Sequence, residues 1–374
     1  MFPHRPTPRP NATAHRNETA GPQAVADPPR TARRSPTSNG LATTQLSRAL
    51  VLFAILGVLA LVALTSVVVG SREIPLSVVW DAVFNRSDIE DHFVIWDLRI
   101  PRTVVAIAVA AALGVAGALI QALTRNPLAD PGILGVNSGA SFAVAIGVGV
   151  FGVTSITQYI WFAFAGALVV TLAVYAIGSA GRGGADPLRL VLAGVALGAA
   201  LSGLTSALTL LDPQAFDKMR NWGAGTVVGR GLDLVWPVLP FLAAGLVIAF
   251  LMARPLNAIA LGEDLARALG ANVLRTRIFV IIAVTLLAGG ATAIAGPIGF
   301  IGLMVPHVAR WIVGPDQRWI LAYTIALAPI LLLVADIAGR LIMRPAEVPV
   351  GIVTAFVGAP VLIVLIRRRK LSGL

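Results

Sequence analysis

The sequence predicts an all-α, polytopic membrane protein of about ten transmembrane helices, and three observations lead to this prediction. Of the 374 residues, 57% are hydrophobic and only 13% are charged, about half the charged share of a typical soluble domain. Apolar runs of roughly 20 residues, the length that crosses a bilayer, recur with short breaks. These runs are continuous, whereas the strands of a membrane barrel would alternate apolar and polar residues.

This composition also excludes several classes of protein. A water-soluble enzyme would have too few polar residues to cover its surface. The sequence contains no cysteine, which excludes disulfides, thiolate metal sites and cysteine nucleophiles. Its four histidines are scattered and no HExxH motif occurs. We therefore expect no catalytic residues, no metal site and no cofactor in this chain.

In chain order, the first element is a tail and the rest is a bundle of helices. Residues 1–45 hold eight prolines and almost no large apolar residues, which predicts a disordered tail rich in Arg and Pro. Residues 46–374 form one transmembrane domain, and its third and eighth spans are short enough to pack inside the bundle. The predicted spans are 46–70, 103–123, 138–152, 158–178, 188–210, 234–253, 275–295, 300–314, 319–337 and 348–366.

An even number of spans places both termini on one side of the membrane, and charge indicates which side. The side with the termini has 20 Lys and Arg residues and 7 acidic residues, and the opposite side has 9 basic and 11 acidic residues. The positive-inside rule makes the first side cytoplasmic. The net charge of +11 is thus explained by topology, so we expect contact with membrane lipid and none with nucleic acid.

Several segments contain more Gly, Pro and polar residues than packing requires. Residues 121–140 hold two prolines and three glycines, so the chain must turn inside the membrane or in a simple cytoplasmic loop. Residues 296–310 have the same content and predict a broken helix. The fifth span carries a small residue at every fourth position (Gly194, Gly198, Ser202 and Ser206). Such a stripe serves either close helix packing or the wall of a translocation path.

The longest cytoplasmic loop, 254–277, contains a short amphipathic helix from Glu263 to Leu269, bounded by Gly262 and Gly270. It is either a solvated connector on the membrane surface or a helix that docks into a cytoplasmic partner.

The sequence contains neither of the usual energy-coupling features of a transporter, buried titratable groups or an ATP-binding loop. Ionisable residues are nearly absent from the spans, and the main exception, Asp336, lies near a span end. An ion-driven carrier normally needs buried titratable groups, so secondary transport is disfavoured. A phosphate-binding loop requires Gly-Lys followed by Ser or Thr. Neither Lys218 nor Lys370 fits that pattern, so ATP would have to be bound by another chain.

Six collinear motifs resemble the FecCD/BtuC-type permease subunits of bacterial ATP-driven importers for iron–siderophores, haem and cobalamin. The resemblance covers about residues 46–370, and TRNPLADP at 124–131 together with residues 204–222 is most similar to the ferric-enterobactin branch. The motifs are RIPR at 99–102, NPLADPGILGVNSGA at 126–140, LAGVAL at 192–197, LGEDLARALG at 261–270, GPIGFIGLMVPHVAR at 296–310 and EVPVGIVTAFVGAP at 347–360.

The resemblance implies the permease fold of type II ABC importers, in the bacterial cytoplasmic membrane. It implies a dimer with a second permease chain of the same or a similar kind, two ATP-binding subunits below it and a periplasmic or lipoprotein substrate-binding protein outside. The implied substrate is a ferric siderophore, with a catecholate favoured. Cobalamin or haem is the alternative within the family, and an ion-coupled secondary transporter is a less favoured one. The chain itself would not be an enzyme.

The resemblance also assigns roles to residues of this sequence. Arginines on the outer face would bind acidic groups of the binding protein, because a guanidinium can hold a carboxylate with two hydrogen bonds. The matching residues are Arg99, Arg102 and Arg340. The coupling helix to the ATPase would be formed by Gly262, Glu263, Asp264, Leu265, Ala266, Arg267, Leu269 and Gly270. The gate and pathway positions would be Asn126, Leu128, Asp186, Pro187, Gly194, Gly198 and Ser202, with 349–360 of the tenth span near the pore.

Overall fold

The computed structural model describes residues 40–42, 44–180 and 187–367, and the regular structure of these residues is entirely helical. A helix lies at each of the ten predicted spans, which confirms the fold class. Seven of these helices are long and apolar enough to cross a membrane, and α5, α13 and α15 are shorter. The ten helices are α1 (Gln45–Val68), α4 (Ile100–Thr124), α5 (Val136–Gly149), α6 (Ile156–Ser179), α7 (Pro187–Leu211), α10 (Leu239–Ala260), α12 (Val273–Ala295), α13 (Ile301–Val313), α14 (Gln317–Ile342) and α15 (Val350–Arg367). The predicted tail lies outside the described residues except at its last few positions.

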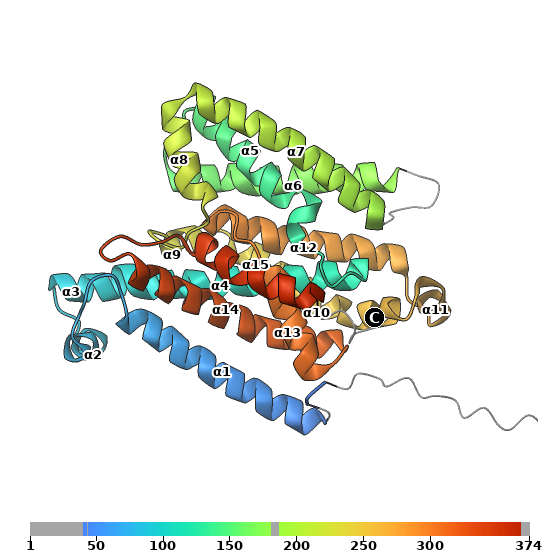
Figure 1. The fold of residues 1–374 in the computed structure, drawn as a ribbon, viewed down its shortest axis with the longest axis horizontal. Helices are drawn as coiled ribbons and strands as arrows, with labels where there is room; N and C mark the ends of the chain where they lie inside the picture. Colours follow the sequence, from blue (N-terminus) through green and yellow to red (C-terminus); the bar gives the residue numbers. More distant parts are fainter. Residues whose placement is uncertain (1–39, 43, 181–186, 368–374) are drawn as a thin grey trace, which may run out of the picture. The chain divides into compact units, whose positions relative to one another are not determined.

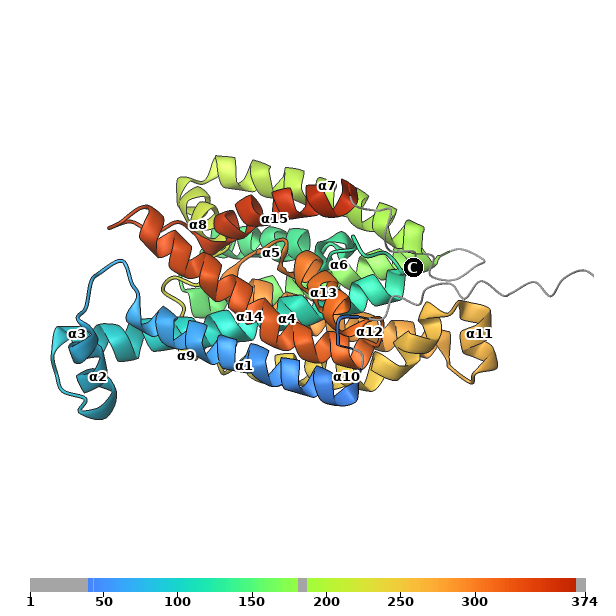
Figure 2. The ribbon, with the colours of Figure 1, turned by 60° about the horizontal axis from the view of Figure 1, so that its bottom comes forward.

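Shorter helices connect the long ones at the two ends of the bundle. One end carries α11, and the opposite end carries α2, α3, α8 and α9 (Figures 1 and 2). We call these the α11 end and the α2 end. The long helices alternate in direction between them, so the loops divide into the two sets that the charge count predicted. The connecting elements are α2 (Leu76–Phe84), α3 (Glu90–Phe93), the π-helix η1 (Val94–Arg99), the 3-10 helix η2 (Pro131–Leu134), α8 (Pro213–Gly223), α9 (Leu232–Val235) and α11 (Glu263–Ala268).

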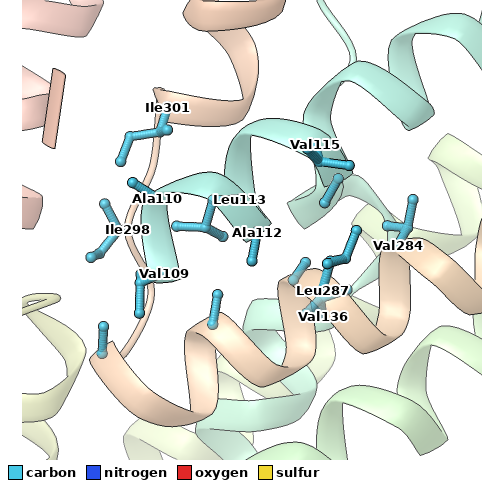
Figure 3. Packing of buried hydrophobic residues seen from close by; sticks show 14 of the residues in the cluster. Val109, Ala110, Ala112, Leu113, Val115, Val136, Val284, Leu287, Ile298 and Ile301 are labelled. Carbon is cyan, nitrogen blue, oxygen red and sulfur yellow. The ribbon is translucent and has the colours of Figure 1, made fainter. Parts of the chain in front are cut away.

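Helix α4 forms the centre of the core and is buried along most of its length. It packs against α12, α13 and α14. Figure 3 shows Val109 and Leu113 of α4 in the cluster that also contains Val284 and Leu287 of α12. Small residues bring α4 closest to α13, since a Cβ atom on Gly117 would overlap the Gly302 carbonyl group. Such close approach is how helices pack in a membrane, where apolar side chains gain little by leaving lipid.

The helices fall into two groups joined by α12. Helix α5 packs against α6, α7 and α8, whereas α1, α10, α13 and α14 gather around α4. Helix α12 contacts members of both groups and lies between them in Figure 1. Helices α1 and α7 have mostly exposed side chains, as expected for surfaces that meet lipid or a second chain.

Both predicted breaks in the helices are present. Helix α4 ends at Thr124, where Arg125 takes a left-handed conformation with φ 50°. Helix α12 ends at Ala295, and Phe300 has φ 69° just before α13 begins. Phe300 is not a glycine, so its left-handed backbone is held by the surrounding structure.

The sixth predicted span, 234–253, was misplaced. Residues 232–235 form the separate short helix α9, and α10 starts only at Leu239. The prediction ended this span before Pro255, but α10 continues through that proline to Ala260. Membrane helices tolerate an internal proline because neighbouring groups can satisfy the freed backbone carbonyl.

Candidate functional site

A buried ionic cluster joins α4 to α14 at the α2 end. Asp336 is only 1% exposed. Its carboxylate accepts hydrogen bonds from Nη2 and Nε of Arg102, at 2.6 and 3.0 Å, and from Nε of Arg340 at 3.0 Å. Glu347 completes the cluster by accepting from Nη1 of Arg102 at 2.6 Å. The two cations and two anions balance, which is the condition for burying charge at tolerable cost. We call these four residues the Asp336 cluster.

Arg340 of this cluster and the neighbouring Arg99 hold the end of α1. Arg340 donates through Nη1 to the carbonyl oxygens of Ser66 and Val69, at 2.7 and 2.8 Å. Arg99 donates to the carbonyl oxygens of Val67 and Val68, at 3.0 and 2.6 Å. The last carbonyls of a helix lack partners within the helix, and a cation there also complements the helix dipole. These contacts tie the otherwise exposed α1 to the core.

The three predicted docking arginines therefore come together, but their guanidinium groups are not free. Arg99, Arg102 and Arg340 are each at most 9% exposed. Their hydrogen bonds are made within the chain, as buried guanidinium groups require. Their docking role stays a prediction. The spacing of Asp336 and Arg340, four residues apart on one helix, was the sequence signal that could have revealed the pair.

The exposed basic side chains that surround this cluster are paired as well. Arg72 contacts Glu90 and Asp91, and Arg344 contacts Glu73. Arg72 and Arg344 therefore add no unpaired positive charge next to the cluster.

Helix α11 confirms the predicted short helix at 263–269 and ends one residue earlier, at Ala268. Gly262 before it has φ 109° and Gly270 after it has φ 81°, conformations that favour glycine. Ala266 is fully buried against α10 and α12. Glu263 forms an ion pair with Arg277 of α12. The helix is therefore anchored on one side.

The other side of α11 projects outward. The side chains of Leu265 and Leu269 are 49% and 63% exposed. An anchored helix with exposed leucines has the features of a docking element. Docking to a cytoplasmic partner, as opposed to a solvated connector on the membrane surface, stays a prediction.

The small-residue stripe of α7 divides into two parts. Gly194 and Gly198 are buried, and a Cβ on Gly194 would collide with the carbonyl of Ile133. Ser202 is exposed and lines a cavity of about 370 Å³ between α5, α7 and α8. Close packing is thus shown for Gly194, whereas a place of Ser202 in the wall of a translocation path stays a prediction. The lining residues are Ser141, Ser202, Thr205, Ser206, Thr209, Phe216, Met219 and Arg220.

The predicted gate residues lie at the α11 end. Asn126 caps its own turn, since its Oδ1 accepts from the Leu128 amide at 3.0 Å. Asp130 begins η2 in the same manner and accepts from the Gly132 amide at 2.8 Å. Burial raises the pKa of Asp130 above its ordinary value. Pro187 begins α7, and Asp186 lies outside the described residues, so gating by these residues stays a prediction.

Among the described residues, no group of three or more His, Asp or Glu side chains could hold a metal ion.

Comparison with known proteins identifies the family. The FecCD transport family profile matches residues 58–368. The ferric enterobactin transport system permease protein FepD of Escherichia coli is 49% identical over 329 residues, which cover 88% of this chain and 98% of FepD. The iron(3+)-hydroxamate import system permease protein FhuB of Bacillus subtilis is 41% identical, over 86% of this chain and 84% of FhuB. A solved metal-chelate type ABC transporter in an inward-facing conformation superposes with a TM-score of 0.75 at 27% identity, covering 86% of this chain and 99% of that one. This multi-pass membrane protein therefore belongs to the FecCD transport family.

Proposed function

We propose that the chain is the permease subunit of an ATP-driven importer that carries a ferric siderophore, with a catecholate favoured, across the bacterial cytoplasmic membrane. The observation that carries this proposal is the 49% identity with FepD along nearly the whole of that protein. Both termini would lie in the cytoplasm, at the α11 end, where the positive-inside rule places the basic loops.

The proposed partners fit the surfaces of the molecule. The sequence holds no phosphate-binding loop, so ATP would be bound by two separate subunits. One of them would dock on the α11 helix of each permease chain. A second permease chain would face α7 and α15, and the translocation path would run between the two chains. A substrate-binding protein would deliver the ferric siderophore at the α2 end.

The packing indicates how a push on α11 would reach the path. Helix α11 contacts α10 and α12, α12 contacts α5 and α6, and these two contact α7. A displacement of α11 would therefore reach α7 through packed helices, as a rigid-body change between two arrangements. Helix α15 packs on α13 and α14, so it would respond through the other half of the bundle.

The docking surface can be tested by replacing Leu265 and Leu269 together with Ala. Both side chains are exposed, so the fold should survive while the apolar contact with the ATPase is lost. We expect the ATPase to stop co-purifying and uptake of iron-55 chelates to fall at least tenfold, on the order of the effect of removing two interface anchors. Leu61→Ala is the matched control, since Leu61 is 64% exposed on α1. If the double variant still co-purified with the ATPase and kept full uptake, α11 would not be part of the interface.

The role of Glu263 is different, because it anchors α11 to Arg277. Glu263→Ala should leave the leucines in place but loosen the helix. We therefore expect ATPase binding with weakened coupling, seen as ATP hydrolysis without proportional uptake.

The substrate is tested by uptake in a strain that lacks the native gene. A panel of labelled ferric catecholate, ferric hydroxamate, haem and cobalamin should give uptake of the ferric catecholate, sensitive to ATP depletion. Uptake that ignores ATP depletion and collapses with the proton gradient would contradict the proposal and favour a secondary transporter.

A further inference from the structure

A second and larger cavity, of about 750 Å³, opens at the α2 end. Its lining residues come from the start of α6, from helix α8 and from the segments that follow α8 and precede α15. Figure 1 labels α6, α8 and α15. The lining side chains that matter here are Tyr159, Lys218, Asn221, Trp222, Arg230 and Glu347. The ionic and docking contacts described above use only Glu347.

Two buried donors at this cavity have no acceptor among the described residues. Arg230 is 8% exposed and its Nε makes no hydrogen bond. The indole Nε1 of Trp222, in a side chain that is 2% exposed, has no partner either. Nearly all buried polar groups in proteins are hydrogen-bonded, so an unpaired one calls for a missing partner. Arg230 lines the cavity, so a ligand that supplies oxygen acceptors could serve as the missing partner of its guanidinium group.

The uncompensated charge of the cavity is positive. Lys218 contacts only the carbonyl oxygen of Val153, at 3.5 Å, and Arg230 interacts with the Tyr159 hydroxyl. Among the described lining residues, Glu347 alone carries a carboxylate. Both of its oxygens are already engaged, by the Ser71 hydroxyl at 2.8 Å and by Arg102 at 2.6 Å. Within the part of the chain that the structure describes, no carboxylate thus pairs with Lys218 or Arg230.

We propose that this cavity is a recognition site for a negatively charged iron(III) chelate, bound by Lys218 and Arg230. The inference rests on the proposed function and specifies the charge of the cargo. A catecholate ligand carries two negative charges, so an iron(III) tris-catecholate is a multiply charged anion. A hydroxamate carries one, so the corresponding tris-hydroxamate is neutral. The cavity favours the former, because Lys218 and Arg230 would compensate its negative charge.

The test uses the complete importer, permease and ATPase together, in lipid nanodiscs. The probes are iron-55 complexes of 2,3-dihydroxybenzoate and of acetohydroxamate, and equilibrium dialysis measures the affinity of each. We expect Lys218→Gln and Arg230→Gln each to weaken binding of the anionic complex about tenfold, the effect of one lost charge-assisted contact. Binding of the neutral complex should not change.

Arg220→Gln is the matched control, because it removes the same charge from α8. The Arg220 side chain is 64% exposed and lines the smaller cavity instead. We expect it to change the affinity for the anionic complex by less than about twofold, since the Arg220 guanidinium is exposed to solvent and already lies 3.7 Å from the Asp217 carboxylate. An equal loss in Arg220→Gln would show a general charge effect and overturn the proposal.

The outcomes separate this inference from the proposed function. If the wild-type importer, reconstituted in liposomes together with its substrate-binding protein, takes up no ferric chelate at all, the proposed function fails. If it takes up chelates and Lys218→Gln leaves the ratio of anionic to neutral affinity unchanged, only the recognition site fails. Lys218 is partly exposed on α8, so this variant should fold even where Arg230→Gln does not, and gel filtration checks both.

Discussion

Replacing Asp336 with Asn should be among the most damaging single substitutions in this chain. Asp336 is almost fully buried and accepts hydrogen bonds from both Arg102 and Arg340. With a neutral amide there, Arg102 keeps Glu347 as its anion, but Arg340 has no carboxylate left among the described residues. Breaking a buried ion pair by removing one partner costs about 3–5 kcal/mol. Because Arg340 also holds the end of α1, we expect that helix to detach first.

The matched control for this prediction is Glu347→Gln in the same cluster. Glu347 is partly exposed, and Arg102 retains both of its hydrogen bonds to Asp336 after the change. The loss should therefore be about 1 kcal/mol, the net value of one hydrogen bond. The assay is reversible unfolding in mixed micelles, followed by circular dichroism, with the free energy of unfolding compared among the three proteins. Equal free energies for the two variants would refute the reasoning that burial and shared partners decide the cost.

Two further substitutions test local packing and capping, with the same unfolding assay. Gly117→Ala should cost about 1–3 kcal/mol, since its Cβ would overlap the Gly302 carbonyl; Gly57→Ala, which meets no neighbouring atom, should cost nothing, and equal losses would contradict the predicted close approach. Asp130→Asn keeps an oxygen for the Gly132 amide and removes a charge that burial disfavours. It should therefore be at least as stable as wild type at neutral pH, whereas Asp130→Ala should be less stable than the Asn variant by about 1 kcal/mol. As pH falls below the ordinary carboxyl pKa, the advantage of Asn over Asp should disappear; an advantage that persists there would show that the charge is not its cause.

Much of the fold could be predicted because its main determinants are local in sequence. A hydrophobic run long enough to cross a bilayer is visible without any knowledge of its neighbours. The break at 121–140 and the short helix between Gly262 and Gly270 were visible for the same reason, because proline and glycine act at their own positions. The error at Pro255 arose where neighbouring helices, and not the local residue, decide whether a helix continues.

The site was harder to predict because its contacts join residues far apart in the chain. Arg102 and Asp336 are separated by 234 positions, and no spacing rule connects them. The family resemblance supplied a role for the arginines at the outer face, but not their burial or their hold on α1. The cavity at Lys218 and Arg230 was missed for a similar reason. It is built from four separate segments, and neither side chain belongs to a motif.

We propose that the chain provides the translocation path and that ATP-hydrolysing partners provide the energy. Reconstitution tests this division of roles most directly. The permease would be placed in liposomes with its substrate-binding protein, with and without the ATPase subunits, and uptake of an iron-55 catecholate complex would be measured. We predict accumulation only when both ATPase subunits and ATP are present. Accumulation against a gradient by the permease alone would contradict the account.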